Sequence, residues 1–389
     1  MNAVYLDHNG TCPPRAEAVA AMVAVLSLPG NPSSVHAQGR EARRRVEVAR
    51  RQVAALVGLP PATLVFTGGG TEANALALNS AGDRAVITSA IEHASVLEAT
   101  PGAVRCPVTT DGAIDLAALD ALLAQAGAPA FISIMAVNNE TGVIQPVAEV
   151  AALARRHGAL FHCDASQAVG RLALDWAAIA PDYLAFSAHK IGGPQGVGAL
   201  FVRDGVPLAP LLRGGGQERR RRAGTENVAG IVGFGAAAAC DVAAFATLAI
   251  LRDRLERELA AVAPDLMVAG AGAARVANTS CLVAPGWRGE TQVMALDLAG
   301  VAVSSGSACS SGKVAASHVL AAMGLGPDLA GAAIRVSLGW STTPKDVDRF
   351  IAAWTDLYRR RPNPASPPAQ QALSHPDVRS VISQSAVQQ

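Results

Sequence analysis

The stretch "YLAFSAHKIGGPQGVGAL", residues 183–200, joins an apolar segment to a histidine, a lysine and several glycines. Its first residues, Tyr183 to Phe186, are typical of a buried strand. Lys190 follows that strand closely, and an amine beside buried residues is costly unless it serves a chemical purpose. The stretch therefore predicts a strand whose carboxyl end carries a functional lysine.

Similar apolar segments recur along the chain and also indicate strands. They lie at residues 85–88, 130–135, 159–163 and 198–202. Helical patterns lie between several of them, such as residues 146–158 with Gly158 at the helix C-terminus. Alternating strands and helices predict an α/β fold with a mostly parallel sheet, both faces of which are covered.

The pattern changes after about residue 255, where helices mix with shorter strands such as "SCLVA" and "IRVSL". We therefore predict a large domain at residues 15–255 and a smaller α+β domain formed by residues 1–14 and 256–360. Residues 361–389 are rich in Pro, Ser and Gln, which predicts a disordered tail.

Composition argues against several classes of partner. Of the 389 residues, 50% are hydrophobic and 16% are charged, and the net charge is +1. This balance favours neither a nucleic acid nor an anionic membrane surface. The N-terminus shows no export signal, and the six cysteines show no zinc-like spacing. We expect a cytoplasmic protein with free thiols and no resident metal.

The apolar segment 228–251 is long enough to suggest a membrane span. However, Asp241 lies in its middle, Ala and Gly dominate it, and an amphipathic pattern continues beyond it. We interpret it as a helix buried in the core of a large domain.

Polar residues follow three of the predicted strands, as "NNETG" (138–142), "DASQ" (164–167) and "SAHK" (187–190). Each could be ordinary turn chemistry, because Asn, Asp and Ser are common in turns. Open α/β sheets, however, bind ligands at the carboxyl ends of their strands. Amide, carboxylate and amine groups at three such ends indicate one site.

These groups match what pyridoxal phosphate (PLP) requires, namely a lysine for a Schiff base, an acid for the ring nitrogen and a phosphate cradle. Lys190 can supply the first and Asp164 the second. The glycine-rich "TGGGTEAN" (67–74) can supply the third, with Thr71 at the start of a helix. The same turn resembles part of a nucleotide loop, but the lysine of a Walker motif is missing.

Three further residues have both a structural and a chemical interpretation. His93 after a strand is either a capping or core histidine, or a proton carrier stacked on the PLP ring. Cys309 in "SSGSACSSG" (304–312) lies either in a flexible linker or in a mobile loop with a nucleophilic thiol. Arg335 forms either a core ion pair or a binding site for an amino-acid carboxylate.

Taken together, the chain resembles the cysteine desulfurases of the NifS/IscS type, in the class V aminotransferase group of fold-type I PLP enzymes. The resemblance runs from about Val4 to about Tyr358. It implies a large domain with a mostly parallel seven-stranded sheet and a smaller α+β C-terminal domain. The motifs that carry it are "YLDHNGT", "GNPSSVHAQGR", "FTGGGTEAN", "EH", "VNNETGVIQP", "DASQ", "SAHK", "GGGQER…RAGT", "SSGSACSSG" and "RVSLGWSTT".

The resemblance also implies a role for each matching residue. Lys190 would bind PLP covalently, Asp164 would pair with the ring nitrogen, Gln167 would reach the phenolic oxygen and His93 would stack on the ring. The phosphate would be bound by Gly70, Thr71, Ser187 and His189, and by Thr225 of the other subunit of a homodimer. Asn139 would contact the cofactor and would hold the substrate carboxylate together with Arg335.

The activity that the resemblance implies is a sulfur transfer. L-Cysteine would become L-alanine, and its sulfur would pass as a persulfide on Cys309 to an acceptor or iron–sulfur scaffold protein. Cys309 is also the residue expected to serve as a transient iron–sulfur cluster ligand. The alternatives are a selenocysteine lyase, another class V aminotransferase, and an inactive PLP-binding scaffold.

The chain departs from the usual family pattern at four places. These are "NGTC" (9–12) where Ala-Thr-Thr is common, Gly68 for a serine, Gln195 for a lysine and Arg220 for a glycine. None of these changes removes a catalytic group.

Overall fold

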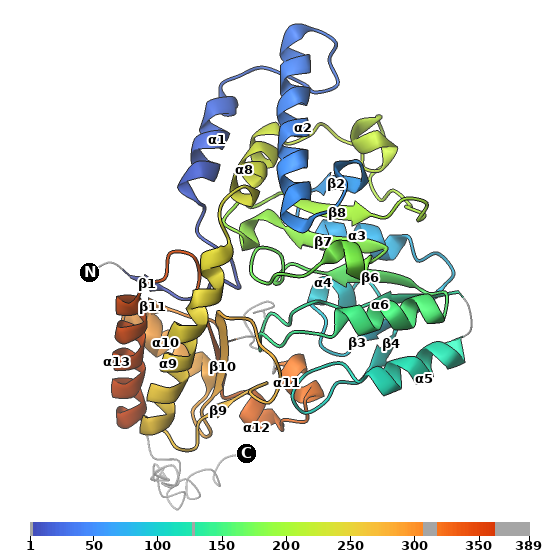
Figure 1. The fold of residues 1–389 in the computed structure, drawn as a ribbon. Coiled ribbons are helices and arrows are strands. Elements are labelled where there is room, and N and C mark those ends of the chain that lie inside the picture. Colours follow the sequence, from blue (N-terminus) through green and yellow to red (C-terminus); the bar gives the residue numbers. More distant parts are fainter. Residues whose placement is uncertain (1–2, 127–128, 306–316, 362–389) are drawn as a thin grey trace, which may run out of the picture.

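A computed structural model describes residues 3–126, 129–305 and 317–361 of the chain. Cys309 and the predicted tail from residue 362 lie outside this part. The described residues form a seven-stranded sheet, a three-stranded sheet and a two-stranded sheet, with helices around them (Figure 1).

The seven-stranded sheet has the strand order β2-β8-β7-β6-β5-β3-β4. Its strands are β2 Leu64–Thr67, β3 Ala85–Ser89, β4 Val104–Cys106, β5 Ala130–Ser133, β6 Leu160–Asp164, β7 Tyr183–Ser187 and β8 Gly198–Val202. All neighbours are parallel except β8, which is antiparallel to both β2 and β7. The predicted α/β fold with a mostly parallel sheet is confirmed; the short strands β2 and β4 were not predicted.

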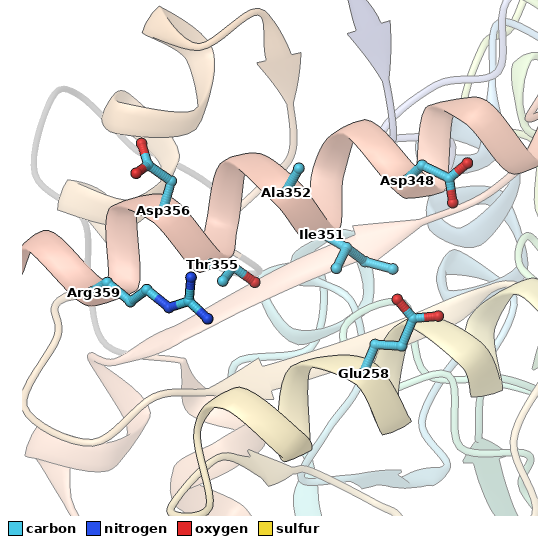
Figure 2. A pocket seen from close by; sticks show the side chains of 7 residues that line it. All are labelled: Glu258, Asp348, Ile351, Ala352, Thr355, Asp356 and Arg359. Carbon is cyan, nitrogen blue, oxygen red and sulfur yellow. The ribbon is translucent and has the colours of Figure 1, made fainter.

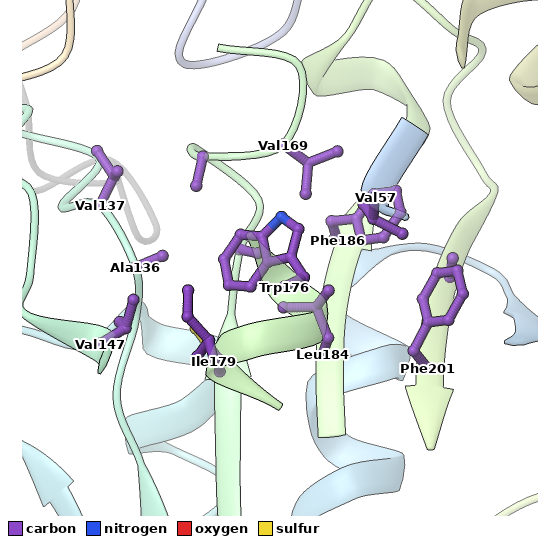
Figure 3. Packing of buried hydrophobic residues seen from close by; sticks show 14 of the residues in the cluster. Val57, Ala136, Val137, Val147, Val169, Trp176, Ile179, Leu184, Phe186 and Phe201 are labelled. Carbon is purple, nitrogen blue, oxygen red and sulfur yellow. The ribbon is translucent and has the colours of Figure 1, made fainter. Parts of the chain in front are cut away.

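Alternating side chains bury both faces of this sheet. Along β7, Tyr183 and Ala185 pack on the face that α3 and α4 cover, whereas Leu184 and Phe186 pack on the opposite face. Figure 3 shows Leu184 and Phe186 beside Trp176 in that second layer. A strand buried on both sides has no polar position, which explains why Tyr183 to Phe186 is continuously apolar.

Two sets of helices cover the sheet. The face with Tyr183 is covered by α3 Gly70–Asn79 and α4 Ala94–Leu97. The opposite layer contains residues of α1 Ala16–Leu26, α2 Ala37–Val57, α5 Leu116–Ala126, α6 Val147–Arg156, α7 Trp176–Ile179 and α8 Val228–Ala238. Gly158 follows α6 with a φ of 63°, as expected after a helix C-terminus.

A second core forms around the antiparallel sheet β12-β10-β9. Its strands are β9 Met267–Val268, β10 Thr279–Val283 and β12 Ala333–Ser337, and its neighbouring helices are α9 Leu248–Val262, α10 Gly289–Leu298, α11 His318–Ala322, α12 Pro327–Ala330 and α13 Pro344–Arg360. Near the N-terminus, β1 Val4–Tyr5 pairs in parallel with β11 Val301–Ala302. Val4 and Leu6 belong to the same core as Trp354. The boundary predicted at residue 255 falls inside α9, and the division into domains stays a prediction.

The prediction of one continuous helix over 228–251 is wrong. The segment forms α8, a 3₁₀ turn at Ala243–Thr247 and the start of α9. The Asp241 carboxylate accepts a hydrogen bond from the Ala243 backbone N–H at 2.7 Å, a local bond that competes with helix continuation. The burial predicted for the first half is confirmed, because most of α8 is buried. Among the described helices, none is both long and apolar enough to cross a membrane.

The basic segment after residue 217 has an unusual backbone. Glu218, Arg219 and Arg220 have φ angles of 42°, 58° and 65°, in the left-handed region that favours glycine. The buried Glu218 carboxylate is bound by Arg50 at 2.8 and 2.9 Å and by the Phe66 backbone N–H at 3.0 Å. This anchor holds the chain in a conformation that its side chains disfavour.

We predict that Arg220→Gly leaves stability unchanged or raises it, whereas Arg220→Val lowers it. A β-branched side chain in the left-handed region costs about 1–2 kcal/mol, and glycine carries no such penalty. The apparent Tm of the two variants, measured side by side, checks this. A valine variant as stable as the glycine variant would contradict it.

Candidate active site

Most of the predicted site residues in the described part of the chain gather at one edge of the large sheet. The parallel strands β5, β6 and β7 end at Ser133, Asp164 and Ser187, so the residues that follow them meet at this edge. The N-terminus of α3 lies at the same edge, in contact with Ser187.

Lys190 ends a 3₁₀ turn that follows β7 directly. Its Nζ atom donates to the backbone carbonyls of Asn9 at 2.6 Å and Gly10 at 2.8 Å. Burial, with the nearby charges of Arg171 and Arg335, lowers the pKa of Lys190 to about 8. A substantial share of the amine is therefore neutral near physiological pH, as a nucleophile or base requires.

Arg171, which was not predicted, holds this arrangement together. The buried guanidinium donates to Asn9 Oδ1 at 2.6 Å, to the Lys190 carbonyl at 3.1 Å and to Gln167 Oε1. Gln167 Nε2 in turn donates to the Asn9 carbonyl at 3.1 Å. Arg171 lies four residues after Gln167, a spacing that places two side chains on one side of a helical turn and could have indicated it.

Asp164 and His93 are joined by two side chains that the sequence did not indicate. Asn74 Nδ2 donates to Asp164 Oδ2 at 2.7 Å and to Ser95 Oγ at 2.9 Å. Ser95 Oγ lies 2.8 Å from His93 Nδ1, and the Ser95 backbone N–H donates to the same nitrogen at 3.1 Å. Asn74 belongs to the quoted motif "TGGGTEAN", one turn into the helix, so a signal was present.

His93 is the N-cap residue of α4, so one of the structural roles considered for it is confirmed. Because Nδ1 accepts a backbone hydrogen bond, the neutral ring carries its proton on Nε2. The side chain is exposed to solvent, yet desolvation by surrounding protein atoms and the charge of Lys190 lower its pKa. This shift favours the neutral ring at pH 7.

The glycine-rich turn and the N-terminus of α3 make up the predicted phosphate site, which we call the anion cradle. Gly69 is the N-cap of α3 and supplies no side-chain cap, so the first N–H groups of the helix stay available. A Cβ atom added at Gly70 would lie 3.3 Å from Ser166 Oγ and 3.4 Å from Ser187 Cβ. Gly70 therefore lies beside Ser187, and Thr71 is the next residue of the helix. His189 follows Ser187 and contacts Thr11, with 3.0 Å between Nδ1 and Oγ1.

Arg335 and Asn139 also meet. From β12, the Arg335 guanidinium donates to the Asn139 carbonyl at 3.0 Å and to Asp7 Oδ1 at 2.7 Å. Arg335 is 5% exposed, and its Nε atom has no hydrogen-bond partner among the described residues. The ion pair considered for Arg335 is therefore confirmed; its partner Asp7 was not predicted, although Asp7 lies in the quoted motif "YLDHNGT".

The described residues that flank the segment containing Cys309 are bound next to this site. The Ser304 backbone pairs with that of Arg335, at 2.6 and 3.1 Å. Ser317 Oγ donates to Glu140 Oε2 at 2.5 Å, and His318 Nε2 lies 3.0 Å from the Glu92 carbonyl. Cys309 itself lies outside the described residues.

Two other features lie apart from these contacts. Thr225 is exposed, and no hydrogen bond of the described residues connects it to the other predicted site residues. A surface groove between α9 and α13 is lined by Glu258, Asp348, Ile351, Ala352, Thr355, Asp356 and Arg359 (Figure 2). It contains none of the predicted site residues.

The five cysteines in the described part of the chain are Cys12, Cys106, Cys163, Cys240 and Cys281, and all are free thiols, as predicted. The search for clustered metal-binding side chains found no group of three among the described residues.

Comparison with known proteins assigns the chain to a family. The model of the aminotransferase class-V family matches residues 4–350. The chain belongs to the aminotransferase class-V family. Within it, the chain is 45% identical to a cysteine desulfurase of Cereibacter sphaeroides, covering 90% of this chain and 94% of that protein. It is 42% identical to a cysteine desulfurase of Klebsiella pneumoniae, covering 92% and 94%.

Solved structures agree with this assignment to the aminotransferase class-V family. A NifS-like protein from Rickettsia africae superposes with a TM-score of 0.86 at 33% identity, covering 92% of this chain and all of that one. The fold is therefore that of the fold-type I PLP enzymes, as predicted.

The residues of this aminotransferase class-V protein fit PLP, the cofactor of the family. Asp164 is a buried carboxylate whose described hydrogen bonds come from the neutral Asn74 side chain and the Ser166 backbone, so a protonated ring nitrogen would balance its charge. Lys190 offers a partly buried amine, and the missing Cβ of Gly70 leaves open the space beside Ser166 and Ser187.

Proposed function

We propose that this protein is a PLP-dependent cysteine desulfurase, which converts L-cysteine to L-alanine and passes the sulfur to a thiol. The observation that carries the proposal is the convergence of Lys190, Asp164 and Arg335 on one edge of the sheet, in a chain 45% identical to a cysteine desulfurase. An amine, an acid for the ring nitrogen and a site for a carboxylate are what PLP chemistry on an amino acid needs.

Bound PLP supplies the electron sink that makes the Cα proton of the amino acid acidic. We assign Asp164 to hold the ring nitrogen protonated and Asn74 to orient that carboxylate. The Lys190 amine, with its pKa lowered to about 8, is assigned as the base that removes the Cα proton and returns it. Gln167, fixed by Arg171, is assigned to the phenolic oxygen of the ring.

Sulfur transfer is assigned to His93 and Cys309. Neutral His93 accepts the proton of the substrate thiol or of Cys309. The Cys309 thiolate attacks the substrate sulfur, so that an S–S bond forms while the C–S bond breaks and its electron pair leaves with the carbon. Protonation of that carbon completes L-alanine, and the overall balance is L-cysteine plus a thiol giving L-alanine plus a persulfide.

The finer features belong to the same proposal. The enzyme acts as a homodimer in which Thr225 of each subunit completes the phosphate site of the other, consistent with its exposed position. The persulfide passes to an acceptor or iron–sulfur scaffold protein in the cytoplasm, for cluster assembly or thiolation. Cys309 would ligate an iron–sulfur cluster only during that transfer.

Two substitutions test the binding of the substrate carboxylate independently of the chemical step. Arg335→Ala is expected to raise KM for L-cysteine by about 100-fold, because a charge-assisted bidentate contact of about 3 kcal/mol is lost. Asp7→Asn removes the partner that orients Arg335 and is expected to raise KM about fivefold, with kcat changed less than twofold. Steady-state kinetics of alanine formation measure both values, and an unchanged KM in Arg335→Ala would refute the assignment.

The function itself is tested by measuring alanine and protein-bound persulfide formed from L-cysteine, in the wild type and in Cys309→Ala. Both products should appear in the wild type and both should be lost in the variant. Cys240→Ala is a matched control, because Cys240 is a free thiol that is not fully buried and lies outside the site.

Other outcomes identify the alternatives. Alanine that persists in Cys309→Ala would indicate a lyase that bypasses this thiol, and selenocysteine would then be the substrate to test. No alanine from a wild type that is fully loaded with PLP would indicate an inactive scaffold.

A further inference from the structure

The anion cradle contains a carboxylate, whose negative charge disfavours phosphate binding unless a positive charge balances it. Glu72 lies in the first turn of α3, and its Oε2 atom accepts a hydrogen bond from the Gly68 backbone N–H at 2.7 Å. That bond turns the carboxylate toward the same loop whose amides would meet the cofactor phosphate. An anion there repels a second, doubly charged anion that binds to the same loop.

Arg222 compensates for this charge. Its Nε atom donates to Glu72 Oε1 at 2.9 Å and its terminal nitrogen donates to Oε2 at 3.2 Å. The two side chains are only 22% and 24% exposed, so solvent screens the pair incompletely. The bond to Glu72 raises the pKa of Arg222 further, and the arginine is permanently charged.

A second anchor holds the chain segment before Arg222 independently of Glu72. Glu218, four residues earlier, is bound by Arg50 and by the Phe66 backbone N–H. Phe66 belongs to β2, which leads directly into the cradle. The backbone from Glu218 to Arg220 adopts positive φ angles on the way. The segment therefore keeps the Arg222 backbone near the cradle even without the bond to Glu72.

We propose that Arg222 is a positioning residue of the phosphate site, which neutralises the Glu72 carboxylate and so keeps the cradle receptive to the phosphate dianion of PLP. This inference rests on the proposed function, because it takes the cradle to bind the PLP phosphate. Arg222 also lies three residues before Thr225. The Arg222–Glu72 ion pair therefore connects the cradle of one subunit to the segment whose Thr225 is assigned to the phosphate site of the other subunit.

The test is the affinity of the full-length apoprotein for PLP, measured by titration for the wild type, Arg222→Gln, Glu72→Gln and the double variant. Arg222→Gln should weaken binding about tenfold, the effect of one uncompensated charge near an anion at a partly exposed site. Glu72→Gln should bind at least as tightly as the wild type. The double variant should recover most of the loss, because the repelling charge is gone.

A purely structural tether gives the opposite pattern. Either single substitution breaks the same ion pair, so Glu72→Gln and Arg222→Gln would weaken PLP binding equally and the double variant would recover nothing; this result would overturn the proposal. If Arg222→Gln fails to fold, Glu72→Gln alone still distinguishes the two roles, because only a purely structural role of the ion pair predicts weaker PLP binding in that variant.

Two controls sharpen the result. Glu41 and Arg44 on α2 form a pair of the same bidentate geometry at 2.7 and 2.8 Å, and Glu41→Gln and Arg44→Gln should leave PLP affinity unchanged. Pyridoxal lacks the phosphate, so its affinity should not differ among the variants. A pyridoxal affinity that falls together with that of PLP would overturn the proposal.

The proposed function and this inference fail separately. A wild type that binds PLP but forms no alanine from L-cysteine would refute the desulfurase, while the comparison of variants would still decide the role of Arg222. A wild-type apoprotein that does not bind PLP would overturn both.

Discussion

Lys190→Ala abolishes the visible absorbance of the bound cofactor and lowers alanine formation by at least ~1,000-fold, if Lys190 is both the covalent anchor and the base. Its Nζ atom lies at the meeting point of β7 and the N-terminal segment, between the carbonyls of Asn9 and Gly10. Alanine keeps the backbone of this turn and removes only the amine.

The small number of lysines makes this result easy to check. The sequence contains only Lys190, Lys313 and Lys345. Lys345 lies exposed on α13, so Lys345→Ala is the control and should keep both absorbance and turnover. Borohydride reduction of the loaded wild type should attach the cofactor to the peptide that contains Lys190. Attachment at another lysine, or unchanged absorbance in Lys190→Ala, would refute the assignment.

Asp164→Asn is expected to retain PLP but to lose most activity, on the order of 1,000-fold in kcat. The amide has nearly the shape of the carboxylate but cannot balance a protonated ring nitrogen. The buried position and the bond from Asn74 hold the side chain, so the loss should come from charge and not from displacement.

The control for this substitution is a second buried aspartate in the same sheet. Asp182 precedes β7 at the opposite end of the strand, where its carboxylate accepts a hydrogen bond from the Phe161 backbone at 2.7 Å. Asp182→Asn should lower the apparent Tm while leaving kcat of the folded protein unchanged. An Asp164→Asn variant with more than a tenth of wild-type kcat would show that the charge is not needed.

The residues assigned to bind PLP could be predicted because they lie in short contiguous motifs. Lys190, Asp164 and the glycines of "TGGGTEAN" each follow an apolar strand, and parallel strands bring their carboxyl ends to one edge. The uninterrupted apolar run from Tyr183 to Phe186 records burial on both faces of the sheet. Such local patterns involve residues only a few positions apart, so they can be recognised in the sequence alone.

The break between α8 and α9 shows where this reading fails. An apolar run from 228 to 251 looks continuous, but the Asp241 carboxylate accepts a hydrogen bond from the Ala243 backbone N–H just after α8 ends. Hydrophobicity alone does not distinguish one helix from two, because both bury the same residues.

Only the tertiary structure decided what surrounds the motifs. Asp7 binds Arg335 across 328 residues of sequence, and Asn9 meets Arg171 across 162. The sequence by itself determined the fold class, the family and the residues assigned to PLP, because strand periodicity and contiguous motifs encode them. Asp7 and Asn9 come from the N-terminal segment, and their contacts with Arg335 and Arg171 form only when that segment packs against parts of the chain far away in sequence, which no local pattern indicates.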